Sequence, residues 1–392
     1  MKFRSLEDLG VRGKRVVVRE DLNVPMRGEA IADYTRVDAA IPTLAWLREH
    51  SARTIVLSHL GRPDGKPDPR LSLRPLAAAL SDRLGIPVAF AADCIGATAQ
   101  QAADALKDGG VLLLENVRFH PGEERNDPAF AGELAKLGAI YVNDAFATAH
   151  RAHASTEGIA HLLPSAAGLQ MEAELTALAR LTESPAKPFV CVIGGAKIAD
   201  KIGVFNRLME HVDAVCVGGG MANTFLAALG VNVGKSLRDN DLGPARSVLG
   251  LAKRRAVDLR LPSDAVIAQA IDSDESHVAD IACVGDEMVL DIGPATAQAY
   301  AGIIEPAKTI VFNGPMGVYE KPAYRRGTQV VGDAIARATA NGAISVVGGG
   351  DAAAAAHMLG FADKVTFLST GGGATLEFLE GKTLPGVAAL ER

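Results

Sequence analysis

The sequence predicts an α/β protein made of two doubly wound parallel-sheet domains joined by a helix. Short apolar runs alternate with helical patterns along most of the 392 residues. The runs are continuously apolar, which is typical of parallel strands buried on both faces. Gly 41 and an aromatic fraction of only 5% suit the many tight strand-to-helix turns of this class. The length allows two domains at roughly 100–200 residues each.

The expected strands follow one another through both halves. Those of the first half lie at 14–20, 52–59, 86–90, 110–118 and 139–146. Those of the second half lie at 188–195, 214–220, 259–267, 288–293, 309–315, 343–350 and 364–373. Between the halves, "MEAELTALARLTE" (171–183) has helical spacing and "SPAKP" (184–188) ends it. We therefore predict domains at 1–170 and 189–375, with 171–188 as connecting helix and hinge.

Composition excludes several classes of protein. The formal net charge is −6 and no basic block occurs, so no nucleic acid is expected as a partner. The opening "MKFRSLEDLGVRGK" has no apolar core of a secretory signal, and no stretch approaches ~18 uninterrupted apolar residues. The four cysteines form no C-x-x-C pair and suit a reducing compartment: Cys94, Cys191, Cys216 and Cys283. We expect a cytoplasmic protein without membrane contact, and a monomer, since no coiled-coil pattern is present.

The two halves end their strands with different residues. Polar and basic side chains end the strands of the first half: Arg19, Asp21, Asn23, His59, Arg62, Asn116, Arg118 and Asp144. Glycines end those of the second half: Gly194, Gly195, Gly218–Gly220, Gly314, Gly348–Gly350 and Gly371–Gly373. Ligands of doubly wound sheets bind beyond the carboxyl ends of the strands. A small anionic substrate is therefore expected on the first half and a nucleotide on the second.

Arginines and one loop support the anion site. "HLGRPDGKPDPR" (59–70) is a polar, basic loop, and loops of this kind often carry function. Taken singly, each of these arginines is more consistent with a surface charge than with a ligand: Arg36, Arg62, Arg118 and Arg151. Four arginines near strand ends of one half favour the anion site, because the planar guanidinium suits carboxylate and phosphate.

In "VVGGGDAAAAAHMLG" (346–360) a strand, three glycines, one aspartate and an alanine run follow in order. Such a corner exposes unpaired backbone N–H groups that suit a phosphate. The alternative is a tight turn with Asp351 as the helix N-cap. The sequence alone leaves both open.

Two further segments of the second half have the same double interpretation. "GGAKIADK" (194–201) spaces Lys197 and Lys201 four apart at an expected helix start, so both are expected on one helical face. They suit phosphate contact or a solvated basic face. "FNGPMGVYE" (312–320) suits a nucleotide loop, with Glu320 accepting from ribose hydroxyls, or a simple turn.

Other motifs are rejected. "GVNVGKS" (230–236) has three residues between its glycines where a P-loop has four. No G-x-G-x-x-G opens a helix, which counts against a nicotinamide-dependent dehydrogenase. His150 and His153 lack a carboxylate or cysteine to complete a zinc pattern, so structural or phosphate-side roles are favoured.

Taken in order, these segments resemble the phosphoglycerate kinase family over essentially the whole chain. The resemblance rests on segments that run from "VREDLNVP" (18–25) to "STGGGATLEFLEGKTLPGV" (369–387). Between them come "SHLGRP" (58–63), "LLENVRF" (113–119), "NDAFATAHRAHAS" (143–155), "GGAKIADKI" (194–202), "VGGGMANTF" (217–225), "FNGPMGVYE" (312–320) and "GGGD" (348–351). The resemblance implies reversible transfer of the acyl phosphate of 1,3-bisphosphoglycerate to ADP, giving 3-phosphoglycerate and ATP with Mg²⁺. It further implies that residues 376–392 return to the first domain.

The resemblance also assigns residues. Those expected to hold the phosphoglycerate are Asp21, Asn23, Arg36, His59, Arg62, Arg118 and Arg151. Those expected to serve the nucleotide are Gly194, Lys197, Lys201, Gly219, Asn313, Pro315, Glu320, Gly348, Gly349, Gly350, Asp351 and Ala352. Asp351 would help to hold Mg²⁺, and Arg36, Lys201 and Gly349 would act on the transferring phosphoryl group.

Physical chemistry agrees with that reaction. The acceptor is a carboxylate or a nucleotide phosphate, so catalysis needs positioning and charge stabilisation rather than a general base. Substrates on separate domains require domain closure that excludes water. Ala352, Ala147 and Phe367–Leu368 depart from the usual family residues, which bears on rate and affinity more than on reaction type. Another α/β kinase acting on an acyl phosphate, or a regulatory nucleotide-binding protein, are the alternatives.

Overall fold

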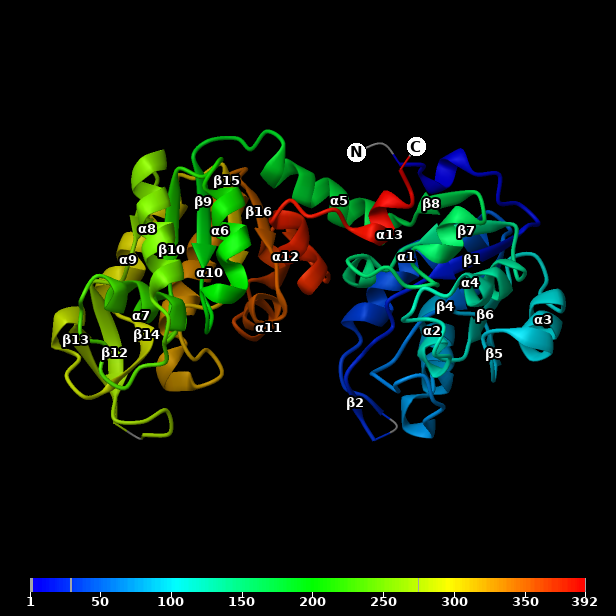
Figure 1. Ribbon diagram of the computed structural model, residues 1–392, viewed down its shortest axis with the longest axis horizontal. Coiled ribbons are helices and arrows are strands. Elements are labelled where there is room, and N and C mark those ends of the chain that lie inside the picture. Colours follow the sequence, from blue (N-terminus) through cyan, green and yellow to red (C-terminus); the bar gives the residue numbers. More distant parts are fainter. Residues whose placement is uncertain (1–2, 29, 274, 392) are drawn as a thin grey trace. The chain divides into compact units, whose positions relative to one another are not determined.

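Residues 3–28, 30–273 and 275–391 are described by the computed structural model. They fall into two compact units, Met1–Thr176 with Thr383–Arg392 and Ala177–Lys382. Each unit is built on a six-stranded parallel sheet, drawn in Figure 1 with its helices. The predicted fold class is confirmed.

The sheet of the first unit has the order β5-β6-β4-β1-β7-β8, and every pair in it is parallel. Its strands are β1 (Arg15–Arg19), β4 (Arg53–Leu57), β5 (Val88–Ala91), β6 (Val111–Leu114), β7 (Ile140–Asn143) and β8 (Ser165–Ala167). Its helices are α1 (Thr35–Glu49), α2 (Arg74–Leu84), α3 (Gly96–Asp104), α4 (Pro128–Ala135) and α13 (Pro385–Ala388). A two-stranded hairpin, β2 (Met26–Arg27) and β3 (Ala30–Ile31), precedes α1.

The valine run of β1 shows why this sheet is covered on both faces. Val16 and Val18 belong to one core cluster together with Leu44 of α1 and Leu80 of α2. Val17 points to the other face and is equally inaccessible. A strand with both faces dry has no use for alternating polar residues, which explains the continuous apolar run.

The sheet of the second unit has the order β11-β10-β9-β15-β16-β17, again parallel throughout. Its strands are β9 (Phe189–Ile193), β10 (Ala214–Val217), β11 (Asp258–Arg260), β15 (Thr309–Asn313), β16 (Ile344–Val347) and β17 (Phe367–Leu368). Its helices are α6 (Ile202–Leu208), α7 (Gly219–Ala228), α8 (Gly243–Arg255), α9 (Pro294–Ile304), α10 (Arg326–Ala340), α11 (Gly350–Met358) and α12 (Gly373–Leu379). Counted along the chain this order is 3-2-1-4-5-6, so the strand order reverses between β9 and β15.

One expected strand was wrong. Residues 259–267 were expected as a single strand, but they divide into β11 and β12 (Asp264–Ala268), which lie in different sheets. Pro262 stands between them, and proline lacks the N–H that a central strand must donate. β12 pairs antiparallel with β13 (His277–Asp280) and with β14 (Met288–Ile292), so 288–293 is a strand but not one of the parallel sheet.

The chain passes between the units at α5 (Leu169–Thr182) and again after α12. The start of α5 is bonded to the first unit, because the Leu169 and Met171 amides donate to Thr43 and Asp144 at 2.8 and 2.9 Å. The unit boundary therefore falls inside the helix, after Thr176, whereas the prediction ended the first domain at residue 170. Of the predicted tail 376–392, the part from Thr383 groups with the first unit, where Gly386 donates to the Ala149 carbonyl at 2.8 Å.

The length and apolarity of the helices bear on whether a segment could span a membrane. Among the residues described, no helix is long and apolar enough to cross a membrane.

Candidate functional site

The loop after β1 meets the N-terminal turn of α1 in the first unit. The guanidinium Nη1 of Arg36 lies 2.7 Å from the Asp21 carboxylate and donates to the Asn23 carbonyl at 3.1 Å. The Asn23 side chain accepts from the Gly61 amide at 2.8 Å. These contacts hold Arg36 at the carboxyl edge of the sheet while its side chain stays 31% exposed. The exposed part of the guanidinium is free to meet an anion from solvent.

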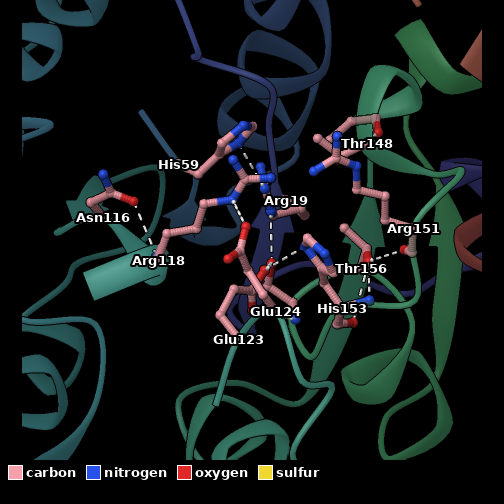
Figure 2. Close-up of polar contacts among 12 residues, drawn as sticks. Arg19, His59, Asn116, Arg118, Glu123, Glu124, Thr148, Arg151, His153 and Thr156 are labelled. Carbon is pink, nitrogen blue, oxygen red and sulfur yellow. Dashed lines mark hydrogen bonds and ion pairs between the residues drawn. The ribbon is translucent and has the colours of Figure 1, made fainter. Parts of the chain in front are cut away.

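Arg118 reaches the loop after β4, which holds Gly61, from the short helical turn after β6. Its Nη1 donates to the Gly61 carbonyl at 2.9 Å, and its Nε lies 3.3 Å from the Glu124 carboxylate. Burial is the main cause that lowers the pKa of Arg118 to about 10, followed by the charge of Arg19. The guanidinium therefore remains protonated at neutral pH. Figure 2 shows it directed toward the group around Arg19.

His59 lies where several positive charges converge. It is buried, and its Nδ1 lies 3.0 Å from Nη2 of Arg19. Burial, then Arg19, Arg118 and Arg36, hold its pKa well below the ordinary value for histidine. His59 is therefore neutral at physiological pH.

Arg62 and Arg151 complete the predicted set in the first unit. Arg62 follows Gly61 directly and is exposed. Arg151 donates from Nε to the His150 ring at 3.1 Å, and its charge contributes to the lowered pKa of both Arg118 and His153. The predicted residues of the first unit thus share one positively charged region, which suits a substrate with several negative charges.

Sequence analysis missed the buried network under this region. Arg19 was noted at a strand end but given no role, and Glu123 and Ser155 were not singled out. Arg19 and Glu123 are completely inaccessible to solvent, although both carry ionisable groups. The signal that could have found Arg19 is its place directly after three valines, where a charge needs a buried partner.

The site of the second unit lies at the reversal of strand order between β9 and β15. A Cβ on Gly194 would lie 1.9 Å from the Pro315 carbonyl oxygen, and one on Gly314 would lie 2.4 Å from the Gly194 carbonyl oxygen. Gly314 also has φ +109, which favours glycine. The two strand ends therefore approach each other through bare backbone. Nucleotides bind at this position in doubly wound sheets.

Lys201 bridges these strand ends. Its Nζ donates to the Gly194 carbonyl at 2.9 Å and to the Asn313 carbonyl at 2.8 Å. The expectation that Lys197 and Lys201 share a helical face was wrong, because α6 begins at Ile202 and Lys197 lies before it. The Ile198 amide donates to the Asp239 carboxylate at 2.8 Å, and a 3-10 turn at Ala199–Lys201 precedes the α-helix. Lys197 is exposed beside the glycine turn.

Asn313 connects this point to the glycine turn after β16. Its Nδ2 donates to the Gly348 carbonyl at 2.6 Å. Its Oδ1 is buried and accepts from no residue that the structure describes. Gly219, the first residue of α7, lies close by and donates to the Met316 carbonyl at 2.9 Å. A buried acceptor without a partner is an unusual feature that a ligand could satisfy.

The geometry of the "GGGD" turn contradicts the alternative interpretation, in which Asp351 is the helix N-cap. The N-cap of α11 is Gly349, with φ +100, and Asp351 lies exposed in the first turn of the helix. Ala352 faces the core instead and is 1% exposed. Burial, then Glu320 and Asp351, raise the pKa of the Tyr319 phenol, which places both carboxylates near that side chain. An exposed carboxylate is a kind of oxygen donor that Mg²⁺ prefers.

One group of possible metal ligands occurs among the residues described. Atoms of Asp93, Cys94 and His120 lie within 4.8 Å of one another. Asp93 and His120 already pair at 2.8 Å, and burial raises the pKa of Cys94. Asp93 and His120 line a cavity of about 1010 Å³ in the first unit, to which none of the residues predicted for phosphoglycerate contributes.

Comparison with known proteins gives one consistent result. The family model for phosphoglycerate kinase matches residues 6–382. A phosphoglycerate kinase of Moorella thermoacetica is 52% identical over 389 residues, covering 98% of each chain. One of Chloroflexus aurantiacus is 51% identical over 100% of this chain and 99% of its own. The structure of phosphoglycerate kinase from Coxiella burnetii superposes with a TM-score of 0.91 at 42% identity, over 99% of both chains.

Proposed function

The chain belongs to the phosphoglycerate kinase family, and on that premise we propose that its first unit holds the phosphoglycerate and its second the nucleotide. It is a glycolytic phosphotransferase that moves the acyl phosphate of 1,3-bisphosphoglycerate to ADP. This function is supported above all by sequence identities of 52% and 51% to two phosphoglycerate kinases, over essentially the full length of both chains in each pair.

The proposed phosphoglycerate site is the positively charged region of the first unit. Its members are Asp21, Asn23, Arg36, His59, Arg62, Arg118 and Arg151. Arg36 and Arg118 are supported by their contacts at one edge of the sheet. Arg118 donates to the Gly61 carbonyl, and Arg36 donates to the carbonyl of Asn23, whose side chain accepts from the Gly61 amide. Planar guanidinium groups pair with carboxylate and phosphate through two parallel bonds, which orients the substrate.

The proposed nucleotide site is the glycine-rich edge of the second unit. Backbone N–H groups of Gly349 and Gly350 would face the phosphates. The N–H groups of Gly194, Gly219 and Gly348 donate to backbone carbonyls, so these glycines would line the site together with Asn313, Pro315, Glu320 and Ala352. Lys197 and Lys201 would supply positive charge. Asp351 would hold Mg²⁺, which when bound neutralises phosphate charge. The donor set fits, because Mg²⁺ is commonly bound by one or two carboxylates together with phosphate oxygens.

The proposed chemistry needs no general base. Arg36 of the first unit, with Lys201 and the Gly349 amide of the second, would stabilise charge on the phosphoryl group in flight. Because donor and acceptor bind to different units, the units must approach during turnover and exclude water. We further propose that the protein works as a cytoplasmic monomer that hinges within residues 171–188.

Arg36→Ala tests the assignment. A charge that acts mainly in the transition state affects turnover more than nucleotide binding, so kcat should fall at least ~100-fold. A coupled assay of ATP-dependent phosphorylation of 3-phosphoglycerate measures this. Arg53→Ala is the matched control, because that arginine pairs with Asp108 at the start of β4, away from the carboxyl edge. Near-normal turnover of Arg36→Ala would assign Arg36 to the surface.

A further inference from the structure

Arg19 carries the buried network beneath the phosphoglycerate region. It is the last residue of β1 and is completely buried. Each of its three nitrogens donates a hydrogen bond: Nε to Ser155 Oγ at 2.8 Å, Nη1 to the Glu20 carbonyl, and Nη2 to His59 Nδ1 at 3.0 Å. Figure 2 shows Arg19 between His59 on one side and the Glu123 region on the other.

The direction of the bond to His59 is fixed by chemistry. A guanidinium has donors only and stays protonated in proteins, so Nδ1 of His59 must accept. A neutral imidazole whose Nδ1 accepts carries its proton on Nε2. Protonation of the ring would place an Nδ1–H donor against an N–H donor, and two positive charges at hydrogen-bond distance.

The other end of the network holds Arg19 in place. Glu123 is inaccessible and accepts from both the amide and the hydroxyl of Ser155, at 2.9 and 2.6 Å. Because the Ser155 hydroxyl donates its only proton to Glu123, its lone pair accepts from Arg19 Nε. Each bond thus has one possible direction, from Arg19 to Ser155 to Glu123, and from Arg19 to His59.

We propose that Arg19 is a positioning residue that locks His59 as the neutral tautomer with its proton on Nε2. Among the residues described, none hydrogen-bonds to Nε2 of His59, so that N–H can donate to an anionic oxygen of the phosphoglycerate. His59 then needs no proton from solvent to bind its ligand. The hydrogen bond from Nε2–H to the phosphoglycerate rests on the proposed function, whereas the tautomer of His59 does not.

The charges that face His59 support a neutral ring. Arg19, Arg118, Arg36 and His153 all act against its protonation, and burial acts in the same direction. Glu123 lies on the far side of Arg19 and is bonded to Ser155, so it gives His59 no direct anionic partner.

The test is nitrogen NMR of the full-length protein labelled in its histidine rings. The two neutral tautomers and the imidazolium give different shift patterns, and loss of signal in His59→Gln assigns the resonances. We expect the wild type to keep the Nε2–H pattern between about pH 5.5 and 8, a range that spans the ordinary histidine value. An Nδ1–H or protonated His59 at neutral pH would overturn the proposal.

Two variants separate positioning from mere folding. Arg19→Met removes the hydrogen-bond donor to His59, but it also takes a nearby positive charge away from the buried carboxylate of Glu123. Ser155→Ala is therefore used as a second, milder variant. In folded Ser155→Ala we expect a mixture of tautomers and a titration closer to that of an ordinary histidine. Ser165→Ala is the control, because its hydroxyl donates to the Ala160 carbonyl at 3.1 Å and does not touch Arg19. If Ser155→Ala kept the wild-type pattern, the network would not be what fixes the ring.

Kinetics separately tests whether Nε2–H of His59 donates to the phosphoglycerate. The amide of glutamine can place a neutral N–H near the position of Nε2, whereas leucine cannot. KM for 3-phosphoglycerate should therefore rise roughly 10- to 100-fold in His59→Leu, the scale of a lost bond to a charged acceptor, and clearly less in His59→Gln. Equal losses in both variants would contradict the donor role. If the NMR pattern of wild-type His59 is the Nε2–H tautomer, equal losses would contradict the proposed binding site and not the role of Arg19 in fixing the tautomer.

Discussion

At the residue scale, the two proposed sites would bind charge by different means. In the first unit, side chains would supply the charge: Arg19 and Glu123 are completely buried, and Arg36 is 31% exposed. In the second, backbone amides of the glycine turn after β16 would replace side chains, and Lys201 is bonded to two carbonyls. A fixed side-chain charge needs a buried framework to hold it, whereas a turn of backbone amides is held by the strand and helix it joins.

Asp351→Ala tests the proposed metal carboxylate. We expect turnover to fall by more than roughly tenfold, above the range of one neutral hydrogen bond, with a lower apparent affinity for Mg-nucleotide. Steady-state kinetics across a Mg²⁺ titration measures both. Asp363→Ala serves as control, since Asp363 is also exposed near a helix start of the second unit. Equal behaviour of the two variants would make Asp351 an ordinary surface acid.

Asp291 predicts a pH dependence of stability. Burial raises its pKa to about 7, although the amides of Gly327 and Ile292 donate to it. A carboxyl group whose pKa rises on folding stabilises the fold fully below its unfolded value, near 3.8, and this stabilisation is lost as pH rises through 7.

The comparison with Asp291→Asn isolates this group. The variant is neutral at every pH, so its stability relative to wild type should increase by on the order of 2 kcal/mol between pH 5 and 8. Denaturant unfolding at each pH gives the difference, and the other buried acids cancel because both proteins contain them. Parallel pH curves would show that Asp291 titrates normally.

At the element scale, the carboxyl ends of β9 and β15 depend on glycine for reasons of space. The Pro315 carbonyl occupies the position where a Cβ on Gly194 would lie. Backbone cannot move aside as a flexible side chain can, so the two strands would have to separate. The same contact positions Lys201 through the Gly194 and Asn313 carbonyls.

Gly194→Ala should therefore lower the free energy of unfolding by about 1–3 kcal/mol or more and weaken nucleotide binding. Gly302→Ala is the matched control. Gly302 lies in α9 and its Cβ would meet nothing within 4 Å, so alanine there should stabilise by about 0.5–1 kcal/mol. Thermal unfolding and nucleotide calorimetry measure both effects. A Gly194→Ala protein as stable as wild type would show that the strand ends tolerate a side chain.

At the scale of the whole molecule, the chain crosses between the units twice, at α5 and after α12. The two crossings tie the units together while each keeps its own sheet and core. A protein that must bring two substrates together and then release products gains from two separately folded units.

Closure can be measured by small-angle scattering in solution. With 3-phosphoglycerate and Mg-nucleotide analogue together, the radius of gyration should be smaller than with either ligand alone. The reason is that each proposed substrate binds to a different unit. Identical scattering in all ligand states would contradict a mechanism gated by closure.

The sequence by itself determined the fold class, the family and the residue types at the strand ends, because continuous apolar runs and glycine turns depend on local neighbours. Its errors had local causes too: Pro262 divided an expected strand, and a 3-10 turn at Ala199–Lys201 separates Lys197 from the helix expected to carry it. Only the tertiary structure decided that Arg19, Ser155 and Glu123 form one buried network under His59. Those residues lie up to 136 positions apart, and no local pattern marks which buried charge will meet which partner once the chain has folded.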